Sequence, residues 1–302
     1  MFNKKLTTFI AAFILMASLV TYTECFAAPS TPTIRVGSKN FTESLVLAEI
    51  YALALEDNGY KVERKLDIAS SVVHTALVNK EIDLYPEYTG TGLLAILKHP
   101  LVTDPQKVYA IVKSEYLKKF NIVWLDYAAA NDSQGLVIKR SIANKLGIKT
   151  LSDLQKNAHQ IRFASQGEFD IREDGLPALE KAYGKFAFKS KAVFDNSLKY
   201  DVLANDKADL AVAYTTEGNL VDKKLLVLVD DKHVWPPYNI APIIRNEVLA
   251  KNPKLAAIIN KVTATIDNEK IIKLNAEIDV NKREYTDVAK EYYDAIKKEI
   301  KK

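Results

Sequence analysis

Short β-type runs alternate with helical runs along this chain of 302 residues, and this alternation constrains the fold more than any other feature. The first runs are predicted as a strand at residues 33–37, a helix at 41–57, a strand at 62–68, a helix at 72–79 and a strand at 82–85. Strands joined by crossover helices give this pattern, so an α/β fold is expected. The 48% apolar and 26% charged residues fit a globular body rather than a disordered chain or a coiled coil.

The first predicted helix carries signals at both of its ends. Asn40 followed by Glu43 suggests an N-terminal cap, and the pair Asn58-Gly59 marks the stop. A helix at 105–120 and a strand at 122–125 complete the first half of the pattern. The segment 126–134 (DYAAANDSQ) is therefore expected to cross to a second unit.

The second unit repeats the alternation and ends at a second break. Its predicted elements are strands at 135–139, 161–165, 186–193, 209–213 and 225–229, with helices at 152–156, 176–183 and 198–205. Pro236 and Pro237 in tandem hold the backbone extended, so residues 231–238 are expected to cross back. A strand at 240–245 and helices at 253–267, 268–277 and 283–301 would then return to the first unit.

Two α/β units joined by two crossings predict two lobes with a cleft between them. Lobe 1 is expected to be discontinuous, at residues 28–130 and 239–302, and lobe 2 to span 131–238. Ligands of open α/β sheets bind near the carboxyl ends of strands. The candidate site is therefore expected in that cleft.

The first 27 residues are predicted to be a secretory signal peptide. Lys4 and Lys5 form a positive start, residues 9–20 are apolar, and residues 25–27 (CFA) precede a cleavage site after Ala27. A membrane anchor would need about 18 apolar residues, more than this run supplies. Lipid attachment at Cys25 is the other alternative, but residues 22–24 (YTE) match a lipobox poorly. We expect a free periplasmic protein.

Charge and motifs exclude several function classes. Lys and Arg total 42 against 38 Asp and Glu, a net charge of +4 spread along the chain, so nucleic-acid binding gains no support. One cysteine and four scattered histidines offer no metal-ligand spacing, and neither a metal nor another cofactor is expected. The motifs of nucleotide-binding loops, serine hydrolases and zinc proteases are absent from the sequence, which disfavours an enzyme.

Tyrosines stand beside turn signals where predicted strands end. Tyr88, Tyr214 and Tyr238 hold such positions, and Tyr85 is expected to be structural because Pro86 and Tyr88 have already entered the turn. A quaternary ammonium has no N–H to donate, and its suitable partner is the negative face of an aromatic ring. A betaine carboxylate would also need cationic or N–H partners, which Lys39, Arg172 and the backbone of residues 89–92 could supply.

Five ordered motifs resemble the substrate-binding proteins of glycine betaine/choline/carnitine ABC importers. They are residues 37–43 (GSKNFTE), 83–91 (DLYPEYTGT), 172–177 (REDGLP), 214–218 (YTTEG) and 230–238 (DDKHVWPPY). The resemblance covers residues 33–299 and implies the two-lobed, type II (Venus-flytrap) architecture of periplasmic binding proteins. It also implies an osmoprotectant receptor, a monomer, that closes on a quaternary amine and passes it to an inner-membrane permease driven by a separate ATPase.

The resemblance also implies roles for individual residues. Tyr88, Tyr214 and Tyr238 match positions whose rings form an aromatic cage around the cation. Lys39, Thr91 and Arg172 match positions that hold a carboxylate or bridge the lobes. Ser70, with its neighbour Ser71, matches a position that varies with the ligand and is expected to tune ligand choice.

One departure from the family pattern concerns the fourth ring of the cage. The aligned residue is Gln134, which could donate to a carboxylate or hydroxyl but has no π-face. Either Tyr127, Phe169 or Trp235 completes the cage, or the preferred ligand differs from glycine betaine. A receptor of the same fold for a non-quaternary solute such as an amino acid is the alternative, and an extracytoplasmic enzyme is a weaker one.

Overall fold

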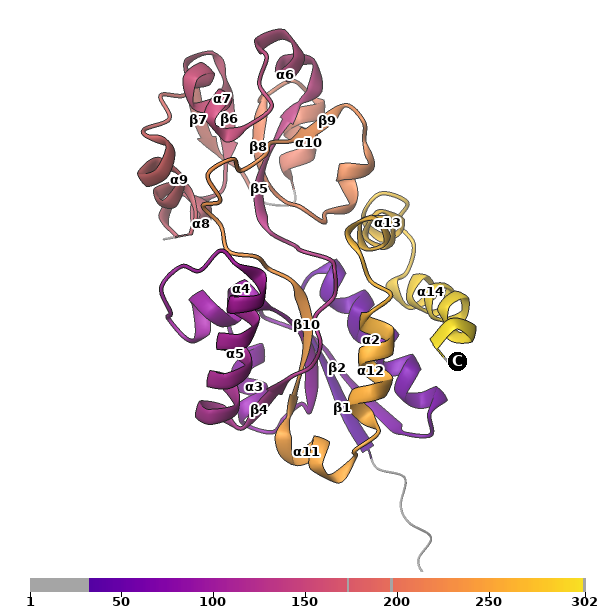
Figure 1. Cartoon of the computed structure of the whole chain (residues 1–302). Helices are drawn as coiled ribbons and strands as arrows, with labels where there is room; N and C mark the ends of the chain where they lie inside the picture. The colour runs from indigo at the N-terminus through magenta and orange to yellow at the C-terminus, as the bar shows by residue number, and fades with distance from the viewer. Residues whose placement is uncertain (1–32, 173, 196–197, 301–302) are drawn as a thin grey trace, which may run out of the picture. The chain divides into compact units, whose positions relative to one another are not determined.

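The computed structural model describes residues 33–172, 174–195 and 198–300 and contains two five-stranded sheets (Figure 1). In the order in which the strands lie, the first sheet contains β2 (Lys61–Ile68), β1 (Thr33–Lys39), β3 (Leu84–Tyr88), β10 (Ile240–Arg245) and β4 (Ile122–Trp124). The second contains β7 (Ser190–Val193), β6 (Arg162–Ser165), β8 (Leu210–Tyr214), β5 (Gln134–Lys139) and β9 (Leu225–Val227). The expected α/β fold is confirmed.

Each sheet combines parallel strands with one antiparallel strand that enters from the far side of a crossing. In the first sheet β1 is parallel to β2 and β3, whereas β10 runs antiparallel between β3 and β4. In the second, β6 is parallel to β7 and β8, whereas β5 runs antiparallel between β8 and β9. Each of the two segments that cross between the sheets therefore leads into the interior of a sheet.

Helices cover both sheets. Those between the strands of the first sheet, or following β10, are α2 (Thr42–Asp57), α3 (Val73–Val78), α4 (Thr89–Thr91), α5 (Pro105–Phe120), α11 (Asn246–Lys251), α12 (Leu255–Thr263), α13 (Asn268–Asp279) and α14 (Tyr285–Ile300). Those of the second are α6 (Arg140–Leu146), α7 (Leu151–Asn157), α8 (Gly167–Ile171), α9 (Leu176–Tyr183) and α10 (Lys199–Ala204), with 3₁₀ turns η2 (Ala158–Gln160) and η4 (Gly218–Val221). A short π-helix, η1 (Gly92–Ile96), follows α4.

Helix α2 is the central helix of the first sheet's main core. Its apolar residues are almost all buried, and they pack with β1 and with the last three helices, α12, α13 and α14. A helix buried on most sides must be apolar on most sides, as the sequence of α2 is. The C-terminal helices thus return to the first sheet, next to which they lie in Figure 1.

The two crossing segments lie side by side between the sheets. Asn131 and Asn239 form an isolated antiparallel bridge between them. The amide of Asp132 donates to the carbonyl of Tyr238 at 3.1 Å, and the amide of Tyr238 donates to Oδ1 of Asn131 at 2.6 Å. These bonds tie the crossings to each other without adding a strand to either sheet.

Helix α13 also contacts the second sheet's elements, through η4. A β-carbon on Gly218 of η4 would lie 2.5 Å from the backbone nitrogen of Ala276 in α13. Only a residue without a side chain permits this approach. The Gly218 contact is therefore a place where the two halves of the described chain meet closely.

Several expected boundaries differ from the structure. The strand expected at 82–85 extends as β3 to Tyr88, so the expectation that Pro86 and Tyr88 had entered the turn is wrong; Pro86 stands opposite Pro242 of β10. The cap expected from Asn40 and Glu43 is also wrong, because Phe41 is the N-cap and has no side-chain capping bond.

Other predictions on the fold have mixed outcomes. The strand expected at 186–193 is reduced to β7, whereas α9 and β10 have the predicted bounds. The predicted signal peptide lies outside the described residues. No helix within the described ranges is both long and apolar enough to cross a bilayer.

Candidate functional site

The ends of β1 and β3 bring Lys39 and Tyr88 together. Lys39 is 4% exposed and forms an ion pair with Glu87, and its Nζ lies 4.8 Å from the centre of the Tyr88 ring. Glu87 also accepts from the hydroxyl of Tyr85 at 2.7 Å and from the amide of Tyr88 at 2.8 Å. The ammonium of Lys39 thus lies beside the Tyr88 ring with a protein carboxylate as its partner, and its contact with a ligand carboxylate stays a prediction. Tyr85 is fully buried, as expected of a structural residue.

The hydroxyl of Tyr88 leads to a buried carboxyl on α2. It donates to Oε1 of Glu43 at 2.8 Å, and Nδ2 of Asn275 on α13 donates to Oε2 at 3.0 Å. The same nitrogen of Asn275 donates to the carbonyl of Thr216 at 2.8 Å, just after β8. Burial raises the pKa of Glu43, although the hydrogen bonds that it receives lower it in part. Glu43 therefore connects the first sheet to the second through one amide group.

Asp132, on the first crossing, is a second carboxyl in this region. The hydroxyl of Thr216 donates to its Oδ1 at 2.6 Å. Burial and then the charge of Glu43 raise the pKa of Asp132 well above its ordinary value. The charge of Asp132 in turn contributes to raising the pKa values of Tyr88 and Tyr214.

Tyr214 ends β8 and lies directly opposite Gln134 of β5 in the antiparallel register. Nζ of Lys199 lies 5.4 Å from the centre of the Tyr214 ring and forms an ion pair with Glu217. The hydroxyl of Tyr200 donates to the same carboxylate. Burial raises the pKa of Tyr214, and the nearby charge of Arg172 lowers it. Half-buried Tyr214 therefore lies beside Lys199, a cation that is itself held by a carboxylate.

Asp174 binds several of the predicted site residues. Its carboxylate accepts from the guanidinium of Arg172 at 2.8 and 2.6 Å and from the hydroxyl of Tyr238 at 2.8 Å. Its carbonyl accepts from Nε2 of Gln134 at 3.2 Å and from Nε1 of Trp235 at 2.7 Å. Burial and the Asp174 charge raise the pKa of Tyr238. Asp174, in the segment after α8, thereby binds Tyr238 of the second crossing.

The remaining predicted residues lie at the margin of these contacts. Thr91 is half-buried at the end of α4, where a β-carbon on its neighbour Gly90 would lie 2.6 Å from the Tyr238 ring. Ser70 is exposed, and both its amide and its hydroxyl lie 3.3 Å from Oδ1 of Asn40. Thr91 thus adjoins the Tyr238 contact, whereas the hydrogen bonds of Ser70 involve the turn before α2.

Hydrogen bonds connect Tyr88 to Tyr238. The hydroxyl of Tyr88 donates to Glu43, which shares the amide of Asn275 with Thr216. The hydroxyl of Thr216 donates to Asp132, whose amide donates to the carbonyl of Tyr238. Tyr214 ends β8 two residues before Thr216.

Of the three aromatic candidates for the fourth ring, one contacts a residue of this region and two pack on other aromatic rings. Trp235 contacts Asp174, whereas Tyr127 packs on Tyr109 with ring centres 4.9 Å apart and Phe169 on Phe163 at 6.4 Å. Phe41, which the sequence did not suggest, lies 5.9 Å from Tyr88. The cage itself and its ligand contacts stay predictions.

Four polar residues of this region were missed from the sequence as site residues. They are Glu43, Asp132, Asp174 and Asn275. Three of them adjoin or lie within segments already singled out, but Glu43 was assigned to a helix cap and the others had no assigned role. Asn275 carried no signal, because a lone amide in a Lys- and Glu-containing helix is ordinarily a solvated residue.

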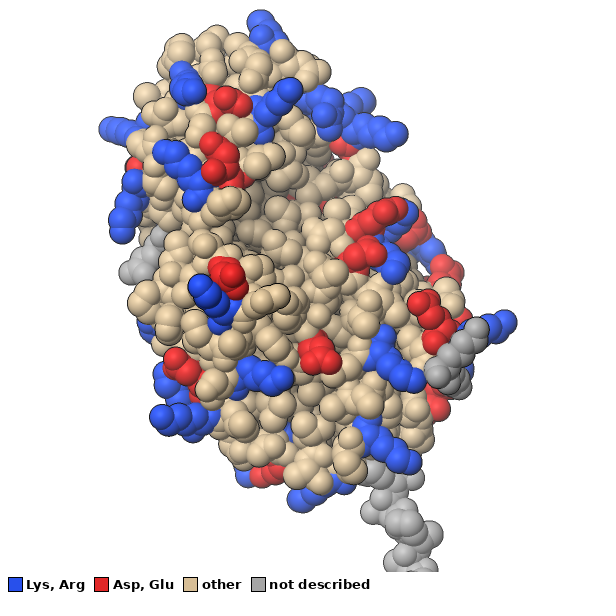
Figure 2. All heavy atoms as spheres, in the orientation of Figure 1, with Lys and Arg blue, Asp and Glu red and all other residues tan. Residues whose placement is uncertain are grey.

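Charged side chains are mixed over the face of the molecule in Figure 2. The surface there is hollowed between the upper and lower parts, and the hollow is mostly tan. The carboxyl-bearing residues described above are buried or half-buried. Among the described residues, no group of three or more His, Cys, Asp or Glu side chains is arranged to hold a metal ion.

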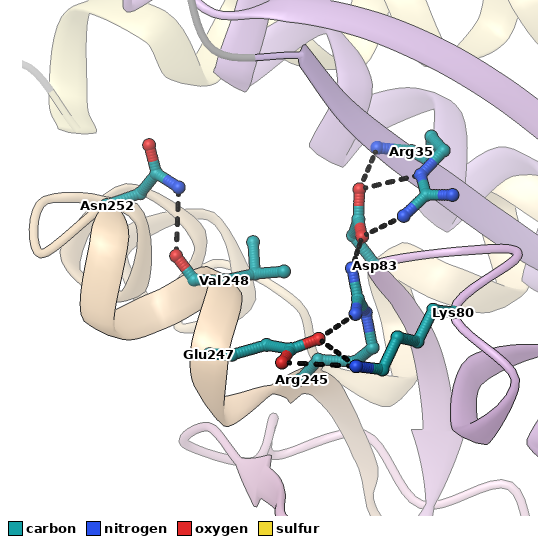
Figure 3. Close-up of polar contacts among 7 residues, drawn as sticks. All are labelled: Arg35, Lys80, Asp83, Arg245, Glu247, Val248 and Asn252. Carbon is teal, nitrogen blue, oxygen red and sulfur yellow. Dashed lines mark hydrogen bonds and ion pairs between the residues drawn. The ribbon is translucent and has the colours of Figure 1, made fainter.

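The opposite end of β1 and β3 carries another ion cluster (Figure 3). Asp83 accepts from the backbone amide of Arg35 at 2.8 Å and from its guanidinium at 2.8 and 3.1 Å. Arg245, at the end of β10, pairs with both Asp83 and Glu247, and Lys80 lies 3.3 Å from Glu247. Burial opposes ionisation of Asp83, but the two arginines hold its pKa below the ordinary value. This cluster joins three strands away from the tyrosines.

Known proteins resemble this chain over most of its length. The family model described as the substrate binding domain of ABC-type glycine betaine transport system matches residues 32–295. The carnitine transport binding protein OpuCC of Listeria monocytogenes serotype 1/2a (strain 10403S) is 32% identical over 94% of this chain and 95% of its own length. A solved structure described as a glycine betaine/carnitine/choline ABC transporter superposes with a TM-score of 0.80 at 29% identity, covering 87% of this chain and 98% of that one.

Another relative contains this region as part of a longer protein. It is the ergothioneine transport permease/ergothioneine binding protein EgtU of Helicobacter pylori (strain G27), 32% identical over 94% of this chain. The present chain spans about half of EgtU, 51% of its length.

These similarities agree with the two sheets and the two crossings, and the expected two-lobed α/β architecture of periplasmic binding proteins is confirmed. The matched family consists of substrate-binding components of transport systems that act outside the cytoplasm, not of enzymes. The chain belongs to the family of substrate-binding domains of ABC-type glycine betaine transport systems.

Proposed function

We propose that this chain captures a quaternary ammonium compound in an aromatic cage and delivers it to an ABC importer. The ligand class comprises glycine betaine, choline, carnitine and related betaines. The partners are a permease in the inner membrane and its ATPase, and the receptor acts as a monomer in the periplasm after cleavage of residues 1–27. Tyr88, Tyr214 and Tyr238 supply the rings, and Lys39, Ser70, Thr91, Gln134 and Arg172 shape the surroundings.

One observation supports this proposal: the three tyrosines come from both sheets and the second crossing, yet hydrogen bonds join the elements that carry them. The Tyr88 hydroxyl is linked through Glu43 and Asn275 to Thr216, two residues after Tyr214. Thr216 is linked through Asp132 to the backbone of Tyr238. A methylated cation offers no hydrogen-bond donor, so it requires ring faces that several elements supply together.

The rings supply part of the binding free energy. A cation–π contact contributes about 0.5–2 kcal/mol, so three rings supply a few kcal/mol. A dissociation constant between about 100 and 1 μM corresponds to roughly 5.5–8 kcal/mol. The rest must come from polar groups and from apolar contact with the methyl groups. Closure of the two sheets about the paired crossings would bring these groups onto the ligand.

Calorimetric titration of the mature protein tests the proposal. Glycine betaine, choline, carnitine and proline betaine are compared with an unmethylated amino acid. We expect at least one quaternary compound to bind below millimolar concentration and Tyr214→Ala to weaken it by about tenfold. Tyr285→Ala, on half-buried Tyr285 of α14, is the matched control and should bind as the wild type does. Binding of the amino acid alone, unaffected by Tyr214→Ala, would contradict the proposal and favour a non-quaternary solute.

Mass spectrometry of the exported protein tests its processing. A mature chain that starts at Ala28 is expected. Retention of residues 1–27, or lipid on Cys25, would contradict the proposed soluble periplasmic form.

A further inference from the structure

The cations near the candidate site are each neutralised by a carboxylate of the protein. Lys39 pairs with Glu87, Lys199 with Glu217 and Arg172 with Asp174. The first of these pairs is almost completely buried, with side-chain exposures of 5% and 1%. A ligand carboxylate would therefore have to compete with a protein carboxylate for any of these cations.

Two carboxyls of the same region receive neutral donors instead. Glu43 accepts from the Tyr88 hydroxyl and the Asn275 amide, and Asp132 accepts from the Thr216 hydroxyl. Within the described ranges, neither carboxyl has a Lys or Arg ion-pair partner. If both ionise, the site carries two negative charges that the protein leaves uncompensated.

Asn275 provides an independent indication of a ligand. The residue is 3% exposed, and its amide nitrogen lies between Glu43 and the carbonyl of Thr216. Its Oδ1 is buried without a hydrogen-bond partner among the described residues. A buried acceptor without a donor destabilises the folded protein. A bound molecule with an O–H or N–H group would satisfy it.

We propose that the site selects a quaternary ammonium ligand that is a net cation with a hydroxyl or N–H donor, and that Asp132 and Glu43 determine this selectivity. The inference rests on the proposed function and narrows its ligand class. Choline is the simplest such ligand, since it carries one positive charge and one hydroxyl. Glycine betaine has the same trimethylammonium group but adds a carboxylate, which the two protein carboxyls would repel.

Proton linkage gives the two ligand classes opposite dependences on pH. Burial favours the protonated forms of Glu43 and Asp132 in the empty site. A net cation stabilises the ionised forms, so its binding releases protons and its affinity rises with pH. A zwitterion places its carboxylate near the same groups, which favours their protonated forms, and its affinity falls or stays constant as pH rises.

Other titratable groups around the two carboxyls must be considered. Glu217 raises the pKa of both, and Tyr88 faces Glu43 from β3. Tyr200 of α10 donates its hydroxyl to Glu217, and Tyr214 ends β8; burial raises the pKa of each tyrosine. Lys39 and Lys199 are the nearby cations and are paired with Glu87 and Glu217. Glu43 and Asp132, whose pKa values are raised, are therefore the expected source of any protons released on binding.

The first experiment uses the wild-type protein and calorimetry. Choline and glycine betaine are titrated between about pH 5.5 and 8 in buffers of different ionisation enthalpy. Choline is expected to bind about tenfold or more tightly than glycine betaine at the upper pH, with proton release. Equal or tighter binding of glycine betaine with the same pH dependence would overturn the inference and leave the proposed function intact. Failure of both ligands to bind would instead contradict the proposed function.

The second experiment tests the assignment to Asp132. Asp132→Asn should lower the affinity for choline by about tenfold and change the affinity for glycine betaine by less than about threefold. The preference for choline is then lost. Asp294→Asn on α14, which removes an exposed carboxylate paired with Lys290, is the matched control and should retain the selectivity. Equal weakening of both ligands by Asp132→Asn would contradict a role in charge selection. If Asp132→Asn does not fold, the wild-type pH dependences still decide the question.

Discussion

The two ends of β1 and β3 carry equivalent ion pairs in different surroundings. Arg35 pairs with Asp83 at one end and Lys39 with Glu87 at the other, each between residues 48 apart in sequence. At the Asp83 end a second arginine, Arg245, joins the carboxylate (Figure 3). At the Glu87 end, the additional titratable group near Tyr88 is the carboxyl of Glu43, which receives neutral donors.

This difference separates an ion cluster that supports the sheet from one that adjoins the candidate binding site. Arginines are always charged and suit a permanent structural carboxylate partner. A carboxyl left with neutral partners in a buried region is costly, and such sites are commonly functional because a ligand completes them. The same pair of strands therefore joins a structural end to a candidate site at the other end.

The largest effect is expected from Glu87→Gln, which breaks the more buried pair. It leaves Lys39, at 4% exposure, with an uncompensated charge, and a loss of about 3–5 kcal/mol of unfolding free energy is expected. The freed ammonium would also repel a cationic ligand beside Tyr88. Urea unfolding and choline titration measure the two effects. Unchanged choline affinity in a folded variant would contradict the placement of Lys39 in the site.

Asp83→Asn, at the other end of β1 and β3, is expected to lower the unfolding free energy by less than Glu87→Gln does. Arg35 keeps 30% of its side chain exposed and Arg245 11%, so water compensates part of the lost charge and about 2–3 kcal/mol is expected. Choline affinity should not change, because this cluster lies away from the tyrosines. Asp294→Asn serves again as the surface control, and its unfolding free energy is expected to lie within about 0.5 kcal/mol of the wild-type value. A loss of binding equal to that of Glu87→Gln would remove the distinction between the two ends.

Gly218→Ala should produce a still smaller loss by separating the two halves. The added β-carbon would lie 2.5–2.7 Å from backbone atoms of α13 that cannot rotate away. A cost of about 1–3 kcal/mol is expected, and choline affinity should fall because Asn275 moves with α13. Gly135→Ala is the matched control, because its added β-carbon would lie 3.4 Å from the nearest atom and should cost less stability. Gly147→Ala is unsuitable as a control because Gly147 has a positive φ of 68°. Equal effects of Gly218→Ala and Gly135→Ala would contradict a tight contact at η4.

The smallest expected effect is the pH dependence of the ligand-free protein. The folded-state pKa of Glu43 is raised, so its contribution to stability is fully present below the unfolded pKa and is lost as pH rises through the folded one. Glu43→Gln should remove this loss and raise stability at about pH 8 by on the order of 1 kcal/mol. Urea unfolding at several pH values measures it. If the unfolding free energy of the wild-type protein increased as the pH rises, the proposal that Glu43 lacks a cationic partner would be contradicted.

The sequence alone indicated the fold because the signals for it are local. The bounds of α9 and β10 follow from apolar runs that end at recognisable breakers, such as Gly184 after α9. The extension of β3 to Tyr88 was not predictable in this way, since a proline such as Pro86 ordinarily argues against a central strand, whereas here it stands opposite Pro242 in the ladder with β10. That pairing depends on a strand more than 150 residues later in the chain.

In the candidate site, too, the residues with local sequence signals were predicted and those that depend on distant partners were not. The tyrosines were identified because strand ends and motifs mark them in sequence. The roles of Glu43 and Asp132 were not, because they depend on Asn275, 232 residues from Glu43, and on Thr216, 84 residues from Asp132. Lys39 was assigned to a ligand carboxylate because its partner Glu87, 48 residues away, cannot be inferred from spacing.

The most direct test of the account compares choline with 3,3-dimethylbutan-1-ol, in which carbon replaces the charged nitrogen at almost unchanged shape. Both are titrated calorimetrically against the mature wild-type protein. If tyrosine faces and uncompensated carboxyls recognise a cation, choline should bind at least about a hundredfold more tightly than the neutral alcohol. Equal affinities would mean that the site recognises the shape of the ligand and not its charge.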